Sequence, residues 1–411
     1  MLLTIFSAEP ATLESKIMPD YTRPGVYINE IPASSQPVTA VSTSTVMFVG
    51  CAASGPVSEP VLISSFTEYQ RLFQGSADAD QSTQADAMTL AVMAFFGNGG
   101  KDAYICRLTS KDEDNNVASL TVNDYTRFYQ TVMATLHDYS LLLLPGQHWN
   151  SNKNSPDNAV ISASLAFCQQ QRQCMLLMDL AADVQLSSAA ATNTLGLPIS
   201  SFAALYYPWL TITNPLAKGT LTIPPAAVAA GLYCRSDGRY GVWKAPAGVT
   251  AKLIGITGLA VNIDDSVQQQ LNPLGINCIR TLPRVGTVLW GARTLASQAD
   301  TEWRYISVRR TAIFIEQSVL QSLQWTVFEP NDQPLWQAVG RNISNFMITL
   351  FRAGAFQGST HQEAFFVRCG LNETMTQQDI SQQQLIIELG FAPVKPAEFV
   401  IIRLRYSLSP P

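Results

Sequence analysis

Charged residues are scarce in this sequence of 411 amino acids. Asp, Glu, Lys and Arg together make up 14% of the chain, whereas about a quarter is usual in soluble proteins. A low charge density indicates either a large core or a surface that partner molecules cover, and composition leaves both open. The formal net charge of −5 and the lack of a Lys/Arg-rich run argue against a general nucleic-acid binder, so no nucleic-acid partner is predicted.

Residue patterns that carry catalysis are also missing. No G-x-S-x-G elbow or H-E-x-x-H motif occurs, and the pair Asp264-Asp265 is explained as a helix cap. The loop 97–101 (GNGGK) lacks the spacing of a phosphate-binding loop, and it joins a predicted helix to a strand rather than the reverse. The histidines are His137, His148 and His361, and none of them lies near a second type of metal ligand at a useful spacing. We therefore expect no catalytic residue, no cofactor, no metal site and no enzymatic activity.

The cysteines form no recognisable framework. Seven are present, an odd number without a C-x-x-C pair, so neither a disulfide scaffold nor a zinc ribbon is indicated. Free cysteines tend to be buried, which predicts reduced and mostly buried thiols. Cys168 and Cys174 lie six residues apart, and this spacing predicts that they do not share one face of a helix.

Long hydrophobic runs are absent as well. Stretches such as Tyr139–Leu144 fall far short of the roughly 20 residues that a membrane span needs, so no membrane insertion is predicted. Residues 1–17 lack a basic start and contain Glu9 and Glu14, which makes a poor signal peptide. We expect the chain to fold in the cytosol, and we expect residues 1–17 to be a flexible extension before Met18.

What the sequence does contain is an alternation of strand and helix patterns. Short apolar runs bounded by turn residues predict strands, and longer runs with helical periodicity and a capping residue predict helices. The predicted strands are 46–51, 61–63, 103–108, 139–144, 175–180 and 202–212, and the predicted helices are 64–73, 84–96, 125–136 and 157–171. This order is typical of an α/β layer.

From about residue 256 the pattern changes to a shorter mixture of strands and helices. Its strongest helix is capped by Asp332, carries Pro334 in its first turn and ends at Gly354. The apolar stripe on this helix consists of Leu335, Val339, Ile343, Phe346 and Leu350. A stripe of this width favours a core helix over one reserved for a partner.

Both ends of the chain read as strands. Each is a β-branched and aromatic run bounded by proline, glycine or serine. The first comprises Val26, Tyr27, Ile28, Asn29, Glu30 and Ile31, and the second comprises Phe399, Val400, Ile401, Ile402, Arg403 and Leu404. Such strands either complete their own sheet or add to that of a neighbour. The Pro/Ser/Thr-rich stretch 32–45 predicts a linker that lets the first strand reach away.

One region reverses the overall sign of charge. Between residues 280 and 310 the acids are Asp300 and Glu302 alone, while the basic residues are Arg280, Arg284, Arg293, Arg304, Arg309 and Arg310. These arginines either face an acidic partner or form internal pairs, for instance with Asp300 or Glu302.

Short motifs follow one another in a characteristic order. They are Pro24-Gly-Val-Tyr-Ile-Asn-Glu30, Tyr206-Tyr-Pro-Trp209, Gly241-Val-Trp-Lys-Ala-Pro246, Leu271-Asn-Pro-Leu-Gly-Ile-Asn277, Trp290-Gly-Ala-Arg-Thr-Leu295, Glu302-Trp-Arg-Tyr-Ile306, Phe328-Glu-Pro-Asn331, Gly354-Ala-Phe-Gln-Gly358 and Ala392-Pro-Val-Lys-Pro-Ala-Glu-Phe399. In this order and spacing, the chain from Met18 to its end resembles the contractile tail sheath proteins of myophages, pyocin-like particles and extracellular contractile injection systems.

The resemblance implies a structural polymer without a nucleotide. Sheath subunits stack as six-fold rings around a rigid inner tube, and neighbours are joined because terminal arms extend each other's sheets. Contraction then requires two packings of one subunit, with the extended one kinetically trapped. The implied partners are copies of the chain itself, paralogous sheath subunits, the inner tube protein, and baseplate and terminal cap proteins. Assembly is expected in the bacterial cytoplasm, and the product is a phage tail or a released extracellular particle.

The implied fold class is α/β and α+β, with an outer α/β domain and an inner, tube-proximal mixed αβ domain that carries exchanged N- and C-terminal β-arms. The predicted segments are an extension (1–17), an arm strand with its linker (18–45), the outer domain (46–255), the inner domain (256–395) and a second arm strand (396–411). The arginines of 280–310 are candidates for a tube-facing or a structural role. Two alternatives stay open: a static baseplate or collar protein with the same fold, and a soluble α/β enzyme.

Overall fold

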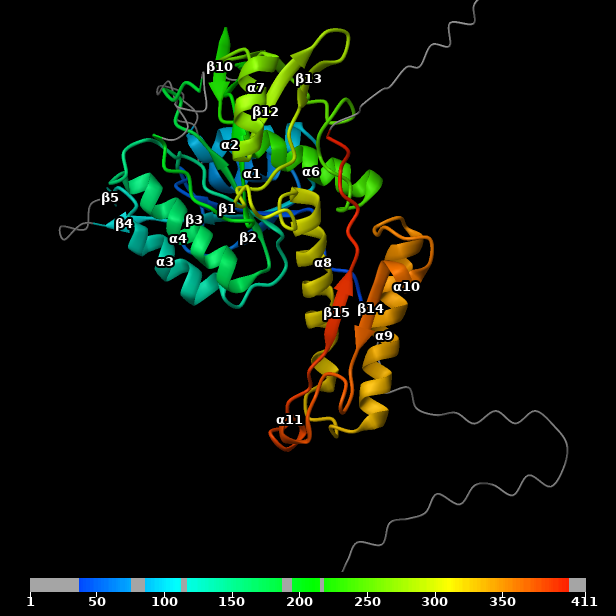
Figure 1. The fold of residues 1–411 in the computed structure, drawn as a ribbon. Helices are drawn as coiled ribbons and strands as arrows, with labels where there is room; N and C mark the ends of the chain where they lie inside the picture. Colours follow the sequence, from blue (N-terminus) through cyan, green and yellow to red (C-terminus); the bar gives the residue numbers. More distant parts are fainter. Residues whose placement is uncertain (1–36, 75–85, 112–116, 187–193, 215–217, 399–411) are drawn as a thin grey trace, which may run out of the picture. The chain divides into compact units, whose positions relative to one another are not determined.

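The computed structural model describes residues 37–74, 86–111, 117–186, 194–214 and 218–398. The chain divides into two units, residues 1–34 and residues 35–411, and all described residues belong to the second. Its main element is an eight-stranded sheet with helices packed against it (Figure 1). The mixed α/β fold expected from the sequence is confirmed. Arm exchange depends on residues outside the described ranges.

The sheet is parallel at its centre and antiparallel at its two edges. From β12 to β3 all neighbouring strands are parallel, whereas the edge strands pair antiparallel. Every residue of β1 and β8 is buried, because helices cover both faces of a parallel sheet. The order across the sheet is β13 (Gly286–Leu289), β12 (Ile276–Leu282), β8 (Ala203–Tyr207), β7 (Met175–Asp179), β6 (Leu141–Leu143), β1 (Thr45–Gly50), β3 (Asp102–Arg107) and β2 (Val61–Ile63).

Alternate side chains of β1 enter two separate cores. Val46 and Phe48 lie in one core together with residues of α1 (Phe66–Phe73), α2 (Ala87–Gly97) and α6 (Ala226–Tyr240). Met47 and Val49 lie in the other core with α3 (Val122–Phe128) and α4 (Pro156–Gln171). This division follows from the two-residue repeat of a strand. A π-helical turn at Tyr129–Met133 continues α3, where the sequence predicted one helix to residue 136.

The loop after α2 is a structural connection. It joins α2 to β3, and the side chain of Asn98 accepts a hydrogen bond from Ile254 N at 2.8 Å and donates to Ala94 O at 3.2 Å. Helix α6 crosses α2 so closely that a Cβ atom at Gly231 would lie 2.3 Å from Phe95 O. Glycine is therefore required at position 231, and the loop residues serve helix packing.

The predicted single strand 202–212 is two strands in two sheets. β8 ends at Tyr207, and β9 (Leu210–Thr213) pairs antiparallel with β10 (Thr220–Ile223) and β11 (Ile256–Leu259). Pro208 stands between them, and proline has no backbone N–H to continue a ladder. The sequence prediction was wrong here because it read through this proline.

The C-terminal part is built on two long helices, α8 (Ile306–Ser322) and α9 (Gln333–Arg352). Asp332 caps α9 by accepting a hydrogen bond from Leu335 N, and the predicted stripe is buried, so α9 is a core helix as expected. Helix α8 was not predicted. The cluster of α8 and α9 also holds residues of the two-stranded sheet β14–β15. The remaining elements are β4 (Ser110–Lys111), β5 (Val117–Ala118), α7 (Asp265–Leu271), α10 (His361–Ala364), β14 (Phe365–Arg368), α11 (Gln377–Ser381) and β15 (Glu388–Phe391), with 3₁₀ turns at Asn272–Leu274 and Gln324–Thr326.

The predicted boundary between an outer and an inner domain, at 255/256, lies in sequence between strands that belong to the same eight-stranded sheet. Strands β12 and β13 follow that point in sequence, yet β12 pairs with β8 in the large sheet. The sheet thus ends at Leu289, and α8 opens the helical part.

Candidate functional site

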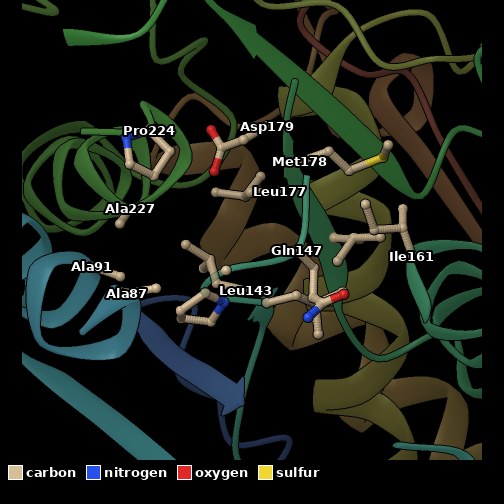
Figure 2. Close-up of a pocket in the computed structure, with 14 residues that line it drawn as sticks. Ala87, Ala91, Leu143, Gln147, Ile161, Leu177, Met178, Asp179, Pro224 and Ala227 are labelled. Atoms are coloured by element: carbon tan, nitrogen blue, oxygen red, sulfur yellow. The ribbon is translucent and has the colours of Figure 1, made fainter. Parts of the chain in front are cut away.

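A catalytic pocket in this fold is expected at the carboxyl ends of the sheet strands, where parallel sheets bind ligands. A cavity does lie at the ends of β6 and β7, between α2 and α6, but its volume is about 20 Å³, which is room for one water molecule. Of the side chains labelled in Figure 2, only Gln147 and Asp179 carry polar nitrogen or oxygen atoms. This cavity is too small and too apolar to hold a substrate.

Asp179 in this cavity has a structural role. Its carboxylate accepts a hydrogen bond from Ala226 N at 2.8 Å, at the start of α6, where backbone N–H groups lack partners within the helix. Burial of the carboxyl group raises its pKa to about 7. The cap is thus held by a group that releases its proton only near neutral pH.

A pH dependence of stability follows from Asp179. Because its pKa is raised in the folded state, that state binds the proton more tightly than the unfolded chain does, and the unfolding free energy falls as pH rises from about 4 to about 7. We expect Asp179→Asn, which keeps an acceptor for Ala226 N, to raise the melting temperature at pH 8 and to leave it nearly unchanged at pH 4. Thermal unfolding at both values measures this. Asp264→Asn, at the exposed cap of α7, is the control, and an equal gain from both variants contradicts the assignment.

No metal centre is present in the described ranges, where no three His, Cys, Asp or Glu side chains come together to bind an ion. His137 contacts the side chain of Gln173 through Nδ1 at 3.1 Å. Burial lowers the pKa of His148, whose ring lies 5.1 Å from that of Trp209. None of the helices in the described part is both long and apolar enough to cross a membrane.

The cysteines are free thiols, and most of them are buried as expected. Cys168 and Cys174 do not share a helix face, as expected, yet the fold brings them together. Cys168 Sγ and Cys174 Sγ lie 3.4 Å apart, both fully buried. Helix α4 ends at Gln171 and Arg172 takes a left-handed conformation, so Cys174 leaves the helix and the chain folds back before β7. The predicted helix also ended at residue 171, but the sequence spacing gave no indication that the turn after it brings the two sulfur atoms together.

The N-terminal segment that leads to the sheet is docked on α8. We call residues 37–44 the N-terminal strap. Its backbone is irregular, in keeping with a linker, but Thr39 N donates to Ser322 Oγ at 2.9 Å and Val41 N donates to Ser318 Oγ at 3.1 Å. The two serines stand one turn apart on α8 and match alternate residues of the strap. Val41 also packs against the cluster of α8 and α9.

A buried ion pair fixes the end of the strap. Arg310 on α8 donates to both carboxylate oxygens of Asp237 on α6, at 3.0 and 2.6 Å, and its Nη2 also donates to Thr43 O at 2.9 Å. The side chains of Arg310 and Asp237 are 3% and 2% exposed, and the guanidinium lies 4.7 Å from the centre of the Tyr233 ring. Arg310 therefore connects α8, α6 and the strap in the molecular interior.

Removing the serines tests the strap directly. We expect the double variant Ser318→Ala/Ser322→Ala to raise hydrogen exchange at the amides of Thr39 and Val41 and to cost about 1–3 kcal/mol of stability, at about 0.5–1.5 kcal/mol for each hydrogen bond. Mass-spectrometric hydrogen exchange follows the peptide. Ser381→Ala is the matched control, because Ser381 Oγ donates within α11 at 2.8 Å. Unchanged exchange at both amides is the contrary result.

The C-terminal segment has a corresponding anchor at its base. Arg293 donates through Nε and Nη2 to the two carboxylate oxygens of Glu398, and Tyr305 OH donates to the same carboxylate at 3.2 Å. The hydrogen bonds that Arg293 donates to Glu398 raise the pKa of Arg293. Asn277 holds the backbone of Arg293 from both sides, accepting from its N and donating to its O, each at 2.7 Å. The chain therefore reaches its last described residue in a fixed position.

Beside this anchor lies an open groove of about 820 Å³. Its lining residues include Pro396, Glu398, Trp290 and Lys244. Both predicted arm strands, Val26–Ile31 and Phe399–Leu404, lie outside the described residues.

The six candidate arginines do not form one charged surface. Arg280 pairs with Asp265 at 2.7 Å, and Arg309 lies 3.6 Å from the Trp303 ring centre. Arg304 donates to Gln298 O at 3.0 Å, while Arg284 is exposed at the turn between β12 and β13. With Arg293 and Arg310 in the anchors above, five of the six arginines have contacts within the chain. The structural role is therefore supported for most of them, and a tube-facing role stays a prediction.

Sequence reasoning missed the acidic and serine partners of these contacts. Arg310 pairs with Asp237, and Arg293 pairs with Glu398. The sequence had instead suggested the nearby acids Asp300 and Glu302 as partners. Asp300 instead accepts hydrogen bonds from the backbone of Glu302 and Trp303. The sequence signal that could have indicated the serine contacts is the spacing of Ser318 and Ser322, because residues four apart lie on the same face of a helix.

Comparisons with known proteins agree on one family. The sequence patterns of the phage tail sheath protein central domain and of the phage tail sheath C-terminal domain match residues 118–295 and 298–407. A chain of the contracted sheath complex of PVC, an extracellular contractile injection system, is 30% identical, with a TM-score of 0.75 over 94% of this chain and 98% of that one. A chain of the six-fold symmetrised baseplate of the anti-feeding prophage is 32% identical, with a TM-score of 0.73 over 94% and 99%.

A further relative matches a smaller part of this chain. The prophage major tail sheath protein of Pseudomonas aeruginosa (strain UCBPP-PA14) is 27% identical over 194 residues, which is 46% of each chain. The match thus spans less than half of that relative, whereas the solved structures are covered almost completely.

Proposed function

Because this chain belongs to the phage tail sheath family, we propose that it is a contractile sheath subunit that forms stacked six-fold rings around an inner tube. The observation that carries the proposal is the match to a contracted sheath over 94% of this chain and 98% of that one. The family is a structural one, and the enzyme alternative is set aside. Contraction drives the inner tube through a target envelope.

Arm exchange is the proposed means of assembly. The sheet β14–β15 has two strands, and neither outer edge is paired within the described part of the chain. A two-stranded sheet is marginal alone and gains stability when further strands are added. We infer that Val26–Ile31 of one subunit and Phe399–Leu404 of another extend this sheet in a third.

The anchors determine where each proposed arm leaves its own subunit. The N-terminal strap is held on α8 by Ser318, Ser322 and Arg310, and the C-terminal segment is held at Glu398. Subunits then rotate against one another while each arm leaves its own subunit at a fixed point.

The domain division is proposed in a revised form. The outer domain extends from residue 46 to about 296, since the sheet ends at Leu289 and the two matched family domains meet between residues 295 and 298. The inner domain then begins with α8. Copies of the chain are the first partners, and the inner tube protein, paralogous sheath subunits, and baseplate and cap proteins are the others.

A static baseplate or collar component is the second candidate. It is favoured by the similarity to a chain of the anti-feeding prophage baseplate. Electron microscopy of the purified chain, alone and with its tube protein, separates the two. A contractile sheath subunit gives long hollow tubes, whereas a baseplate or collar component gives discrete rings. Small monomers under both conditions contradict the proposal.

A further inference from the structure

The pair Cys168 and Cys174 is a site that sheath assembly leaves unexplained. The two Sγ atoms lie 3.4 Å apart and both residues are fully buried. A disulfide bond is about 2.05 Å long, so the sulfur atoms need to approach by roughly 1.4 Å. Rotation of the two side chains with a small shift of the turn between them supplies such a movement.

The turn between the two cysteines contacts the C-terminal part of the molecule. Arg172 Nε donates to Glu316 Oε1 on α8 at 2.9 Å, and Gln317 Nε2 donates to Arg172 O at 3.4 Å. Gln173 donates to Leu136 O at 2.8 Å. Any bond between Cys168 and Cys174 therefore closes a short loop whose middle holds α4 and β7 against α8.

We propose that Cys168 and Cys174 are an oxidisable dithiol that forms an intramolecular disulfide when a low-molecular-weight disulfide oxidises it. One protein thiolate attacks the oxidant and releases one small thiol. The second protein thiol then attacks the mixed disulfide, forms the Cys168–Cys174 bond and releases the second small thiol. The protein loses two electrons and two protons, and the oxidant gains both.

The surroundings of the pair favour slow oxidation after assembly. The hydrogen bond with Cys168, together with burial, raises the pKa of Cys174 well above its usual value, and the thiolate is the reactive form. Oxidation of the pair is therefore slow, and a reducing cytosol keeps both thiols reduced. On the proposed function, the particle later meets oxidising surroundings, where disulfides persist. The bond then limits the motion of the turn and keeps Arg172 against Glu316.

Peptide mapping identifies the bond without a variant. Trypsin cleaves after Lys153, Arg172 and Lys218, so Cys168 and Cys174 fall into separate peptides, 154–172 and 173–218, with one cysteine each. The full chain is incubated with oxidised glutathione at pH 8, and free thiols are alkylated before digestion. We expect the two peptides to be linked, with the loss of two hydrogen atoms, and the link to disappear after reduction.

Thermal unfolding supplies the second readout. Closing this short loop is expected to raise the melting temperature by roughly 2–5 °C. Cys174→Ser removes both the link and the rise. Cys106→Ser keeps both, since Cys106 is buried elsewhere against Met47 Sδ at 3.2 Å. This control makes the result specific to the pair.

Two results overturn the proposal. One is the absence of the linked peptide while the exposed Cys51 becomes glutathionylated, which proves that the oxidant was active. The other is an equal rise of melting temperature in Cys174→Ser. Electron micrographs of the same samples report assembly separately, so failure of the dithiol and failure of the sheath function are distinguishable.

Discussion

Deleting residues 399–411 is expected to leave a folded subunit that no longer forms tubes. The three hydrophobic cores of the described chain end before Glu398, and the anchor of Glu398 on Arg293 is retained, so the deletion removes the proposed arm strand and the residues after it without touching a core. Polymer should fall from most of the protein to less than about a tenth, because main-chain pairing by this strand is the proposed link between subunits. Sedimentation velocity and electron microscopy measure polymer, and circular dichroism verifies folding.

A point substitution gives a sharper version of this experiment. Ile401→Pro removes one backbone N–H from the predicted strand and is expected to block assembly nearly as well as the deletion. Ile401→Val is the matched control, since it keeps the backbone donor and β-branching. Intact tubes from the chain without residues 399–411 would contradict arm exchange by this segment. Loss of tubes in both Ile401 variants would instead indicate a side-chain effect.

A variant of Glu398 distinguishes the role of the anchor from that of the arm strand. Glu398→Gln keeps the length and the polarity of the side chain but removes the ion pair with Arg293 and weakens the contact from Tyr305. If the anchor fixes the direction of the arm, tubes still form but in lower yield than for the unaltered chain. The Phe399–Leu404 strand is unchanged in this variant, so a complete loss of tubes would mean that the anchor itself is required for pairing.

Strands and capped helices were predictable because their signals are local. β1 and β7 are short apolar runs between turn residues, and the sequence placed them within one residue of their ends. Asp332 and Pro334 mark the start of α9 for the same reason, since the cap and the first turn are neighbours in sequence. The residues that predict each of these elements lie within the element or next to it.

Helix α8 escaped prediction because little of it is exposed to solvent and many of its polar residues are buried. Twelve of its residues are buried, among them Arg309 and Arg310, so the two arginines interrupt the apolar pattern without pointing to solvent. A helix buried on most sides shows no amphipathic period. α6 was missed as well, and it too is buried along most of its length.

The ion pairs could not be predicted because their partners are remote in sequence. Arg310 lies 73 residues from Asp237, and Arg293 lies 105 residues from Glu398. A sequence gives proximity only along the chain, which is why Asp300 and Glu302 were considered. The same limit explains Cys168 and Cys174, whose contact depends on where α4 ends and on the left-handed backbone of Arg172.

The second large effect is expected at the buried ion pair. Asp237→Ala leaves the Arg310 guanidinium almost fully buried without its carboxylate, and breaking a buried pair by removing one partner costs about 3–5 kcal/mol. We expect a loss of that size in the unfolding free energy. Chemical denaturation of the assembly-deficient chain that lacks residues 399–411 measures it without interference from polymer.

The matched control is an exposed pair on the same helix. Glu316 on α8 pairs with Arg172 at 2.9 Å, with side chains 41% and 50% exposed, and such pairs contribute about 0–1 kcal/mol. Glu316→Ala should therefore have little effect on unfolding. Equal losses in Asp237→Ala and Glu316→Ala would contradict the assignment of Arg310 as an internal structural residue.

The double variant Asp237→Leu/Arg310→Met distinguishes charge from packing. Replacing both partners by apolar residues of similar size is often neutral or stabilising, so most of the loss seen in Asp237→Ala should be recovered. Thr43 O then loses its donor from Arg310, and hydrogen exchange in the N-terminal strap should rise while the core of α6 and α8 stays protected. A stable double variant with an unprotected strap would therefore assign two separable roles to Arg310: compensating the buried charge of Asp237 and holding the base of the N-terminal arm.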